Sequence, residues 1–197
     1  MIQKKNKKIT IKNQSEIETY FKDKSIKLLK NSSLTFINKI EIEPNVIFKG
    51  NNYFGEENVI EANCRLENVK IDNRNKIKHS SILIKSTLGK TNIIGPFAYI
   101  RDNTSIKNNC IVGAYVETTR SIINSECKIS HQAFIGDAKI GKNTIIGAGT
   151  IFCNFNFKTL KKERTIIGSY CKIGSNVTII SPKKIKANSL VPASTKF

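Results

Sequence analysis

The sequence predicts an all-β solenoid, a parallel β-helix built from hexapeptide repeats, with a short N-terminal α-helix before it. From Ile42 onward an aliphatic or aromatic residue, here called an anchor, returns at every sixth position; the next are Phe48, Phe54 and Ile60. Most of the 11 glycines directly follow an anchor. A period of six fits neither an α-helix, with about 3.6 residues per turn, nor the two-residue alternation of a strand. Each strand and turn of a parallel β-helix, however, restarts at that interval.

Length and composition agree with one solenoid domain, or with one domain and a small appendage. The chain has 197 residues, 39% of them hydrophobic, and no tryptophan, which suits the narrow interior of stacked coils. It has no apolar run of about 18 residues, so we expect no membrane span. The charged start, MIQKKNKK, does not resemble a secretory signal, and we expect a cytoplasmic protein.

The net charge of +18 arises from 33 basic and 15 acidic residues. Such a balance can serve nucleic-acid binding. The lysines are scattered along the turns, however, without a basic helix and without aromatic residues interleaved for base stacking. We therefore expect no nucleic-acid partner. Small phosphorylated ligands benefit from the same positive field.

The five cysteines predict packing rather than metal binding. No two form a C-x-x-C pair, so no metal site is expected. Four of them occur four residues after an anchor, where Ala, Thr, Ser and Val also occur: Cys64, Cys110, Cys127 and Cys171. This regularity indicates small buried residues, and free thiols fit a cytosolic compartment.

Residues 1–35 lack the repeat and predict a helix and a linker, followed by the solenoid over 36–197. Ser15 and Glu18 have the spacing of a capping box, and Ile17, Phe21 and Leu28 share one helical face. We expect a helix over about 15–30 that packs on the first coils or on a neighbouring subunit.

The repeat is interrupted at four places and by one long loop. Its spacing changes around 66–71, 82–87, 118–122 and 135–140, and the polar segment 155–164 is inserted further on. A loop of this kind adds nothing to the stacking of coils. We therefore interpret it as a candidate lid or ligand clamp.

Several motifs occur in one order: GPFAYIRDNTSI, VGAYVETTRS, SHQAFIGDAKIGKNTIIGAGT and IFCNFN. In this order and spacing the chain resembles the acetyltransferase half of the bacterial bifunctional glucosamine-1-phosphate acetyltransferase / N-acetylglucosamine-1-phosphate uridyltransferase family. The resemblance implies a left-handed parallel β-helix with three hexads per coil, assembled as a homotrimer whose active sites lie between neighbouring helices. It also implies acetyl-CoA as co-substrate and a place on the route to UDP-N-acetylglucosamine, a precursor of the cell envelope.

The resemblance implies the catalytic residues. His131 matches the family's general base, which keeps the attacking amine neutral. Glu117 matches the glutamate that orients the imidazole and stabilises its charged form. Arg101 matches the arginine that grips the sugar phosphate with its forked donors.

The resemblance also implies an acetyl-CoA site. Ala148 matches the position whose backbone N–H faces the acetyl carbonyl and stabilises the developing oxyanion. Asn154 and Phe155 match an Asn-Tyr pair beside the thioester and the pantetheine arm. Ser175 and Val191 match two further positions near the cofactor.

Three residues at the family's sugar-binding positions differ from the family pattern. A phosphate-binding lysine is replaced by Thr119, with Arg120 alone keeping a charge nearby; a tyrosine is replaced by Phe134 and an asparagine by Ile145. Each change removes polarity, and an unpaired buried partner costs about 1–3 kcal/mol. We therefore expect weaker binding of glucosamine 1-phosphate.

The family's other parts have no counterpart in the sequence. We expect no uridyltransferase activity, because its Gly-rich phosphate loop is absent and the first glycine is Gly50. The family's C-terminal arm, which completes a neighbour's CoA site, is also not matched. Lys161, Lys162 and Arg164 of the long loop are candidates to replace its contacts with the CoA phosphates.

Three functions remain open at this point. The first is acetyl-CoA-dependent N-acetylation of an amino-sugar phosphate, with glucosamine 1-phosphate as the first candidate. The second is the same reaction on another acceptor, such as a nucleotide-linked or deoxy amino sugar. The third is a non-catalytic trimeric scaffold that partners a separate nucleotidyltransferase.

Overall fold

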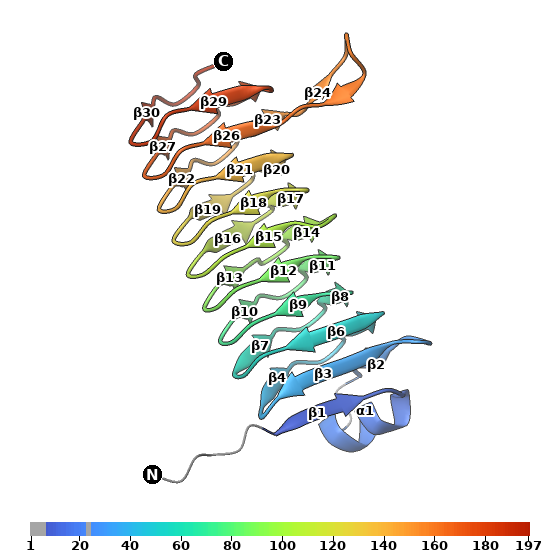
Figure 1. Cartoon of the computed structure of the whole chain (residues 1–197). Coiled ribbons are helices and arrows are strands. Elements are labelled where there is room, and N and C mark those ends of the chain that lie inside the picture. Colours follow the sequence, from blue (N-terminus) through green and yellow to red (C-terminus); the bar gives the residue numbers. More distant parts are fainter. Residues whose placement is uncertain (1–6, 23–24) are drawn as a thin grey trace, which may run out of the picture.

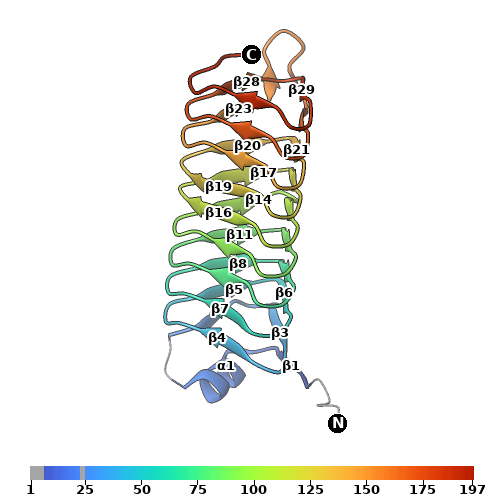
Figure 2. The same ribbon diagram turned by 90° about the vertical axis from the view of Figure 1, so that its left-hand side faces the viewer.

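The computed structural model describes residues 7–22 and 25–197, and it confirms the β-solenoid with a short N-terminal helix. Three long sheets form a three-sided prism around a narrow core (Figure 1). From the N-terminus at the bottom, the chain rises through a rear, a front and a left face in turn (Figure 1), which makes the β-helix left-handed. Figure 2 shows the left face toward the viewer.

Each face is one sheet. All of its strands are parallel, except that the first strand of the front sheet is antiparallel to its neighbour. The front face comprises β1 (Lys8–Ile11), β3 (Ser33–Ile37), β6 (Asn51–Phe54), β9 (Lys70–Ile71), β12 (Thr87–Leu88), β15 (Ser105–Ile106), β18 (Ile122–Ile123), β21 (Ala138–Ile140), β26 (Thr165–Ile167) and β29 (Lys183–Ile185). The left face comprises β4 (Ile40–Ile42), β7 (Asn58–Ile60), β10 (Lys76–Ile77), β13 (Ile93–Ile94), β16 (Ile111–Ala114), β19 (Lys128–His131), β22 (Ile145–Ile146), β27 (Lys172–Ile173) and β30 (Leu190–Val191). The rear face comprises β2 (Lys27–Leu28), β5 (Ile47–Lys49), β8 (Arg65–Glu67), β11 (Ile82–Ile84), β14 (Tyr99–Arg101), β17 (Glu117–Thr119), β20 (Phe134–Gly136), β23 (Ile151–Cys153) and β28 (Thr178–Ile180).

Backbone hydrogen bonds between successive coils hold each residue above its counterpart one coil below. For example, the N–H of Ile47 donates to the Cys64 carbonyl over 2.9 Å, and the N–H of Ile82 donates to the Ala98 carbonyl over 2.8 Å. The anchors therefore form three vertical columns that point inward. The left-face column includes Ile42, Ile60, Ile77, Ile94, Val112, Ile129, Ile146 and Ile173, all buried.

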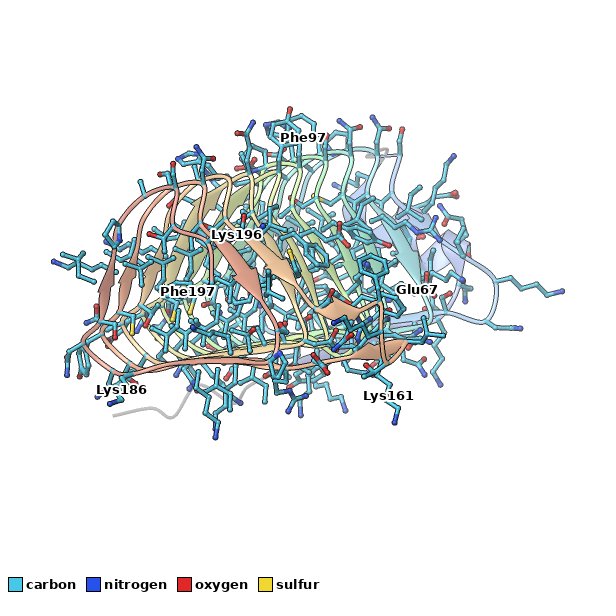
Figure 3. All side chains as sticks on the ribbon, turned by 90° about the horizontal axis from the view of Figure 1, so that it is seen from above. Glu67, Phe97, Lys161, Lys186, Lys196 and Phe197 are labelled. Atoms are coloured by element: carbon cyan, nitrogen blue, oxygen red, sulfur yellow. The ribbon has the colours of Figure 1, made fainter. Side chains whose placement is uncertain are left out.

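The four changes of spacing lie on one edge of the prism, the corner between the rear and front faces. There the anchors are five residues apart instead of six, as between Leu66 and Ile71, or between Ile135 and Ile140. The long loop leaves from the same corner as the hairpin of β24 (Phe155–Asn156) and β25 (Lys161–Lys162). In the axial view, Phe97, Lys186 and Glu67 mark the left–rear, front–left and rear–front corners (Figure 3).

The N-terminal helix is shorter than the expected 15–30: α1 spans Gln14–Phe21. Its N-cap is Asn13, whose side chain accepts from the Glu16 N–H, so the capping pair lies two residues before the Ser15/Glu18 pair that the spacing suggested. The helix ends where Lys22 adopts a positive φ of 47°. Beyond it, Leu28 packs in β2 instead of on the helix, and β3 spans the boundary expected at residue 35.

The first coil is closed by α1 and β1. Strand β1 pairs antiparallel with β3 and ends that sheet, while Ile17 and Phe21 are buried and Phe21 contacts the ring of Phe36. Such a cover protects the end of the solenoid core.

Within 7–22 and 25–197 no helix is long and apolar enough to cross a membrane. Residues 1–6, which include most of the charged start, lie outside the described part.

A column of buried polar side chains runs along the front–left corner. The Asn58 side-chain carbonyl accepts from the Asn75 N–H over 2.9 Å, Asn75 accepts from Asn92 in the same way over 2.9 Å, and Asn92 accepts from the Cys110 N–H over 2.8 Å. Higher coils place Cys127 at this position.

The expectation that the four regularly spaced cysteines are small buried residues is confirmed. Burial raises the pKa of the Cys64 thiol to about 11.

The inward column of the rear face contains one polar residue among the described coils, Thr118, between Ile100 and Ile135. Its hydroxyl is buried without a hydrogen-bond partner. Replacing Thr118 with valine should therefore stabilise the fold by about 1 kcal/mol, because valine keeps the shape and removes the unpaired hydroxyl. Chemical denaturation measures the change in the free energy of unfolding.

The matched control for this substitution is Thr144→Val. The Thr144 hydroxyl is equally buried but donates to the Gly168 carbonyl over 3.0 Å, so its loss should destabilise the fold. A T118V variant that loses stability as T144V does would contradict this account of the core.

Candidate functional site

The left–rear corner places three of the expected site residues in one column. The register of the left face sets His131 directly above Ala114, Ala148 above His131, and Ser175 above Ala148. The N–H of Asn176 donates to the Ala148 carbonyl over 2.7 Å, which fixes the upper step. Three residues distant in the sequence are thus brought together in one column.

His131 is exposed at the end of β19, and its ring has no hydrogen bond or ion pair with any residue of the described chain. The imidazole is therefore open to a ligand on the left–rear corner. The other histidine, His79, is exposed in the same column three coils below and contacts the edge of Phe97, at 5.1 Å between ring centroids.

The backbone N–H of Ala148 also lacks an acceptor among the described residues. Lower coils satisfy the N–H at this position with a glutamate from the coil beneath: Ala62 donates to Glu43 over 2.9 Å, and His79 donates to Glu61 over 3.0 Å. In the coil beneath Ala148, the residue equivalent to these glutamates is Ser130. The Ala148 N–H, one coil above His131, is thus without an acceptor in the described chain.

Glu117 lies on the outer surface of the rear face, beside Phe134. Its carboxylate accepts from Arg101 Nε over 2.9 Å and from Arg101 Nη2 over 2.6 Å. Within the described chain it forms no hydrogen bond or ion pair with His131, and the expected support of the imidazole stays a prediction. The physical reason is that Arg101 is one coil below on the same face, whereas His131 is on the corner before it.

The rear–front corner carries a network of side chains from four successive coils, here called the corner network: Arg101, Asp102, Glu117, Thr119, Arg120, Asp137 and Asn154. Asp102 accepts from Arg101, from the Thr119 hydroxyl over 3.1 Å and from Arg120 over 3.3 Å. Asp137 accepts from Arg120 Nε over 2.7 Å and Nη2 over 2.9 Å, and also from the Asn154 amide.

These contacts shift the ionisation of the corner network. Burial by itself raises the pKa of Asp137, but hydrogen bonds from Arg120 and Asn154 outweigh it and hold the pKa below its ordinary value of 3.8. The pKa of Asp102 is lowered in the same way against its burial, by Thr119 and Arg101. The hydrogen bond to Asp137 raises the pKa of Arg120. Two arginines thus face three carboxylates, and the network carries no excess positive charge.

Thr119 and Val191 do not lie where a ligand can reach their side chains. Thr119 is buried, and its hydroxyl is bonded to Asp102, Arg101 and Arg120. The Val191 side chain continues the inward column of the left face and is 5% exposed; its expected place at the cofactor stays a prediction. Its position follows from its being an anchor.

The other expected binding residues are divided between two faces. Ile145 is exposed on the left face, and Ser175 is exposed at the left–rear corner. Phe134 lies on the rear face, where its ring and the Asn154 amide cover Gly136: a Cβ on Gly136 would approach them to 2.8 and 2.5 Å. Phe134 and Asn154 are therefore adjacent, and any larger residue at Gly136 would displace them.

The hairpin of β24 and β25 projects from the solenoid at the rear–front corner (Figure 1). Phe155 is half exposed in β24 and contacts Phe157 edge to face, with centroids 5.4 Å apart. Lys161, in β25, pairs with Asn156 across the hairpin and is labelled at that corner in Figure 3. The inserted loop is thus an ordered projection beside the corner network.

Sequence reasoning missed Asp102 and Asp137. Both carboxylates occupy the irregular corner, in register with Arg120 and Asn154 at intervals of 17 or 18 residues. That spacing is the length of one coil, so the coil length was the signal that could have grouped them. In the described ranges no group of three or more His, Cys, Asp or Glu residues could hold a metal ion.

The fold and repeat define a left-handed β-helix protein of the hexapeptide type, and the family model "Bacterial transferase hexapeptide (six repeats)" matches residues 85–120. Over 156 residues the chain is 41% identical to the bifunctional protein GlmU of Wigglesworthia glossinidia brevipalpis, covering 79% of this chain and 33% of that protein. Over 159 residues it is 38% identical to GlmU of Ruthia magnifica subsp. Calyptogena magnifica, covering 81% and 35%.

The chain thus spans about a third of the length of the curated relatives it matches. The resemblance that its motifs indicated is confirmed by these relatives. Among solved structures, LpxA from Acinetobacter baumannii aligns with 85% of this chain and 70% of its own, at 16% identity and a TM-score of 0.36. A similarity this low supports no argument about the site.

Replacing Arg120 with methionine should make the stability of the fold less sensitive to acid. Because Arg120 holds the pKa of Asp137 below 3.8, the ion pair stabilises the fold above that pH, and this contribution is lost as the pH falls through the lowered pKa of the folded state. The difference in the free energy of unfolding between wild type and R120M should therefore be largest near neutral pH. Denaturation at a series of pH values measures it, and a difference that stays constant into the acid range would contradict the assignment.

Proposed function

We propose that this protein is an acetyl-CoA-dependent N-acetyltransferase of an amino-sugar phosphate, with glucosamine 1-phosphate as the leading acceptor. One observation carries the proposal: the imidazole of His131 lies one coil below the N–H of Ala148, and neither group has a hydrogen-bond partner among residues 7–22 and 25–197. A base and an oxyanion donor on adjacent coils are the two groups that acyl transfer to an amine requires. The similarity to GlmU supports the same assignment.

In the proposed mechanism the acceptor reacts as a neutral amine, and His131 removes one proton from its nitrogen as it attacks. The amine nitrogen forms a bond with the carbonyl carbon of the thioester, and the carbonyl oxygen gains negative charge beside the Ala148 N–H. The carbon–sulfur bond then breaks, and the CoA thiolate takes up the proton held by the imidazolium. The products are the N-acetyl sugar and CoA, and His131 returns to its neutral form.

The acceptor phosphate is assigned to Arg101 and Arg120. Both guanidinium groups are already bonded to carboxylates, so a phosphate must share or displace those partners. A doubly charged phosphate is a stronger partner than one carboxylate at such a fork. The affinity for the acceptor is therefore expected to depend on salt concentration, since it is an exchange among charged groups.

Glu117 keeps its predicted role beside His131 only if the carboxylate is shared with Arg101 or the imidazole is presented by a neighbouring subunit. We propose a homotrimer with sites between adjacent helices. The rear face supports this, because it exposes the apolar side chains of Ile82, Ile151 and Ile180, which a neighbouring helix can cover.

The five free cysteines fit a reducing compartment, and we assign the reaction to the cytoplasm.

A less polar acceptor is the second candidate, and Phe134 favours it. The ring lies beside Asn154 without the hydroxyl of a tyrosine, and Thr119 is buried. A nucleotide-linked or deoxy amino sugar would lose less binding free energy beside Phe134 and Thr119 than glucosamine 1-phosphate does. Rates of acetyl transfer to a panel of amino sugars separate the two candidates, and a strong preference for glucosamine 1-phosphate would eliminate the second.

Replacing His131 with alanine should lower the rate of acetyl transfer by about 10²- to 10⁴-fold, the usual contribution of a general base. A thiol-release assay with acetyl-CoA and glucosamine 1-phosphate measures the rate. His79→Ala is the matched control, because His79 is exposed in the same column three coils below and should leave the rate unchanged. If H131A releases thiol as fast as wild type, the mechanism is wrong.

A further inference from the structure

Asp137 differs from the other carboxylates of the corner network in its burial and in its two partners, Arg120 and Asn154. It lies in the turn after β20, and its side chain is the most buried of the carboxylates in the corner network's ion pairs, with 12% of its surface exposed. One of its oxygens accepts from Arg120 Nε, and the other accepts from both Arg120 Nη2 and the Asn154 amide. One carboxylate therefore joins the guanidinium assigned to the acceptor with the amide assigned to acetyl-CoA.

The same residue also holds both ends of the projecting hairpin. Its side chain bonds Asn154, which directly precedes β24, and its carbonyl accepts from the N–H of Thr165 over 3.2 Å, directly after the loop. The two ends are further joined by the Glu163 N–H, which donates to the Asn154 carbonyl over 2.8 Å. Asp137 thus lies at the base of the hairpin.

Asp102 provides a natural comparison, two coils below Asp137 and one coil below Arg120. It also accepts from Arg120 and from Arg101, but its side chain is 41% exposed and forms no hydrogen bond with a hairpin residue in the described chain. Both aspartates therefore bond Arg120, but only Asp137 also bonds a residue at the base of the hairpin. A difference between them isolates the part of the network that reaches residues 154–165.

We propose that Asp137 is a positioning residue that couples Arg120 to the base of the β24–β25 hairpin. It acts on the ligands only through Arg120 and Asn154, and its relevance to catalysis rests on the proposed function. Because both oxygens are shared between the two partners, removing the negative charge loosens the arginine and the hairpin together. The coupling itself is a property of the free protein and needs no ligand.

The test compares Asp137→Asn with Asp102→Asn in the full chain. Limited trypsin digestion, with the cut sites located by mass spectrometry, reports opening of the hairpin at the exposed Lys158, Lys161 and Lys162. Loss of charge-assisted hydrogen bonds at its base should raise the cleavage rate there about tenfold in D137N. Cleavage in D102N should remain at the wild-type rate.

The kinetic arm uses the acetyl-transfer assay. D137N should raise the KM for acetyl-CoA and for the acceptor, each by about tenfold, whereas D102N should raise the KM for the acceptor alone. A purely structural role of Asp137 would instead produce trypsin cuts throughout the solenoid together with an unchanged KM for acetyl-CoA. That pattern, or wild-type cleavage of the D137N hairpin, would overturn the proposal.

The two arms separate this inference from the proposed function. If wild type transfers no acetyl group while D137N still releases its hairpin, the coupling stands and the function is wrong. If wild type transfers acetyl groups and the D137N hairpin is cut no faster than that of D102N, the function stands and the coupling is wrong.

Discussion

The structure depends on the hydrogen bonds that stack each coil on the one below. They fix the rise between coils, so most residues have a vertical neighbour 17 or 18 positions away, or 27 across the coil that carries the hairpin, and side-chain positions become columns. The inward columns of the described coils are apolar except at Thr118, which is why Ile and Val recur with a period of six. A corner column can be polar, and there the side chains of successive coils bond one another, as Asn58, Asn75 and Asn92 do.

The site follows from the same constraint. Stacking places Ala148 on His131, although 17 residues of chain separate them, and it places Asp137 between Arg120 and Asn154. Groups that act together therefore need no loop of special shape, only positions one coil apart. The hairpin is the exception, since it leaves the stack, and its base is tied back to the column through Asn154 and Thr165.

The sequence was sufficient to predict the columns but not the contacts between their outward side chains. The anchors, the buried cysteines and the hexapeptide fold follow from periodicity, because burial repeats with the coil. The helix boundary did not follow, because Asn13/Glu16 and Ser15/Glu18 have the same spacing and only the backbone selects between them. The pairing of Glu117 with Arg101 was missed for another reason. Arg101 lies one coil below Glu117 on the same face, and the contact depends on how the two outward side chains bend toward each other, which the repeat does not encode.

The central claim is that His131 and Ala148 on the left–rear corner face the reacting groups. The most direct measurement is a crystal structure of the protein soaked with acetyl-CoA and glucosamine 1-phosphate. The account predicts density for the thioester carbonyl within hydrogen-bond distance of the Ala148 N–H, and for the sugar amine within reach of the His131 ring. Density for both ligands elsewhere on the prism, with this corner empty, would contradict it.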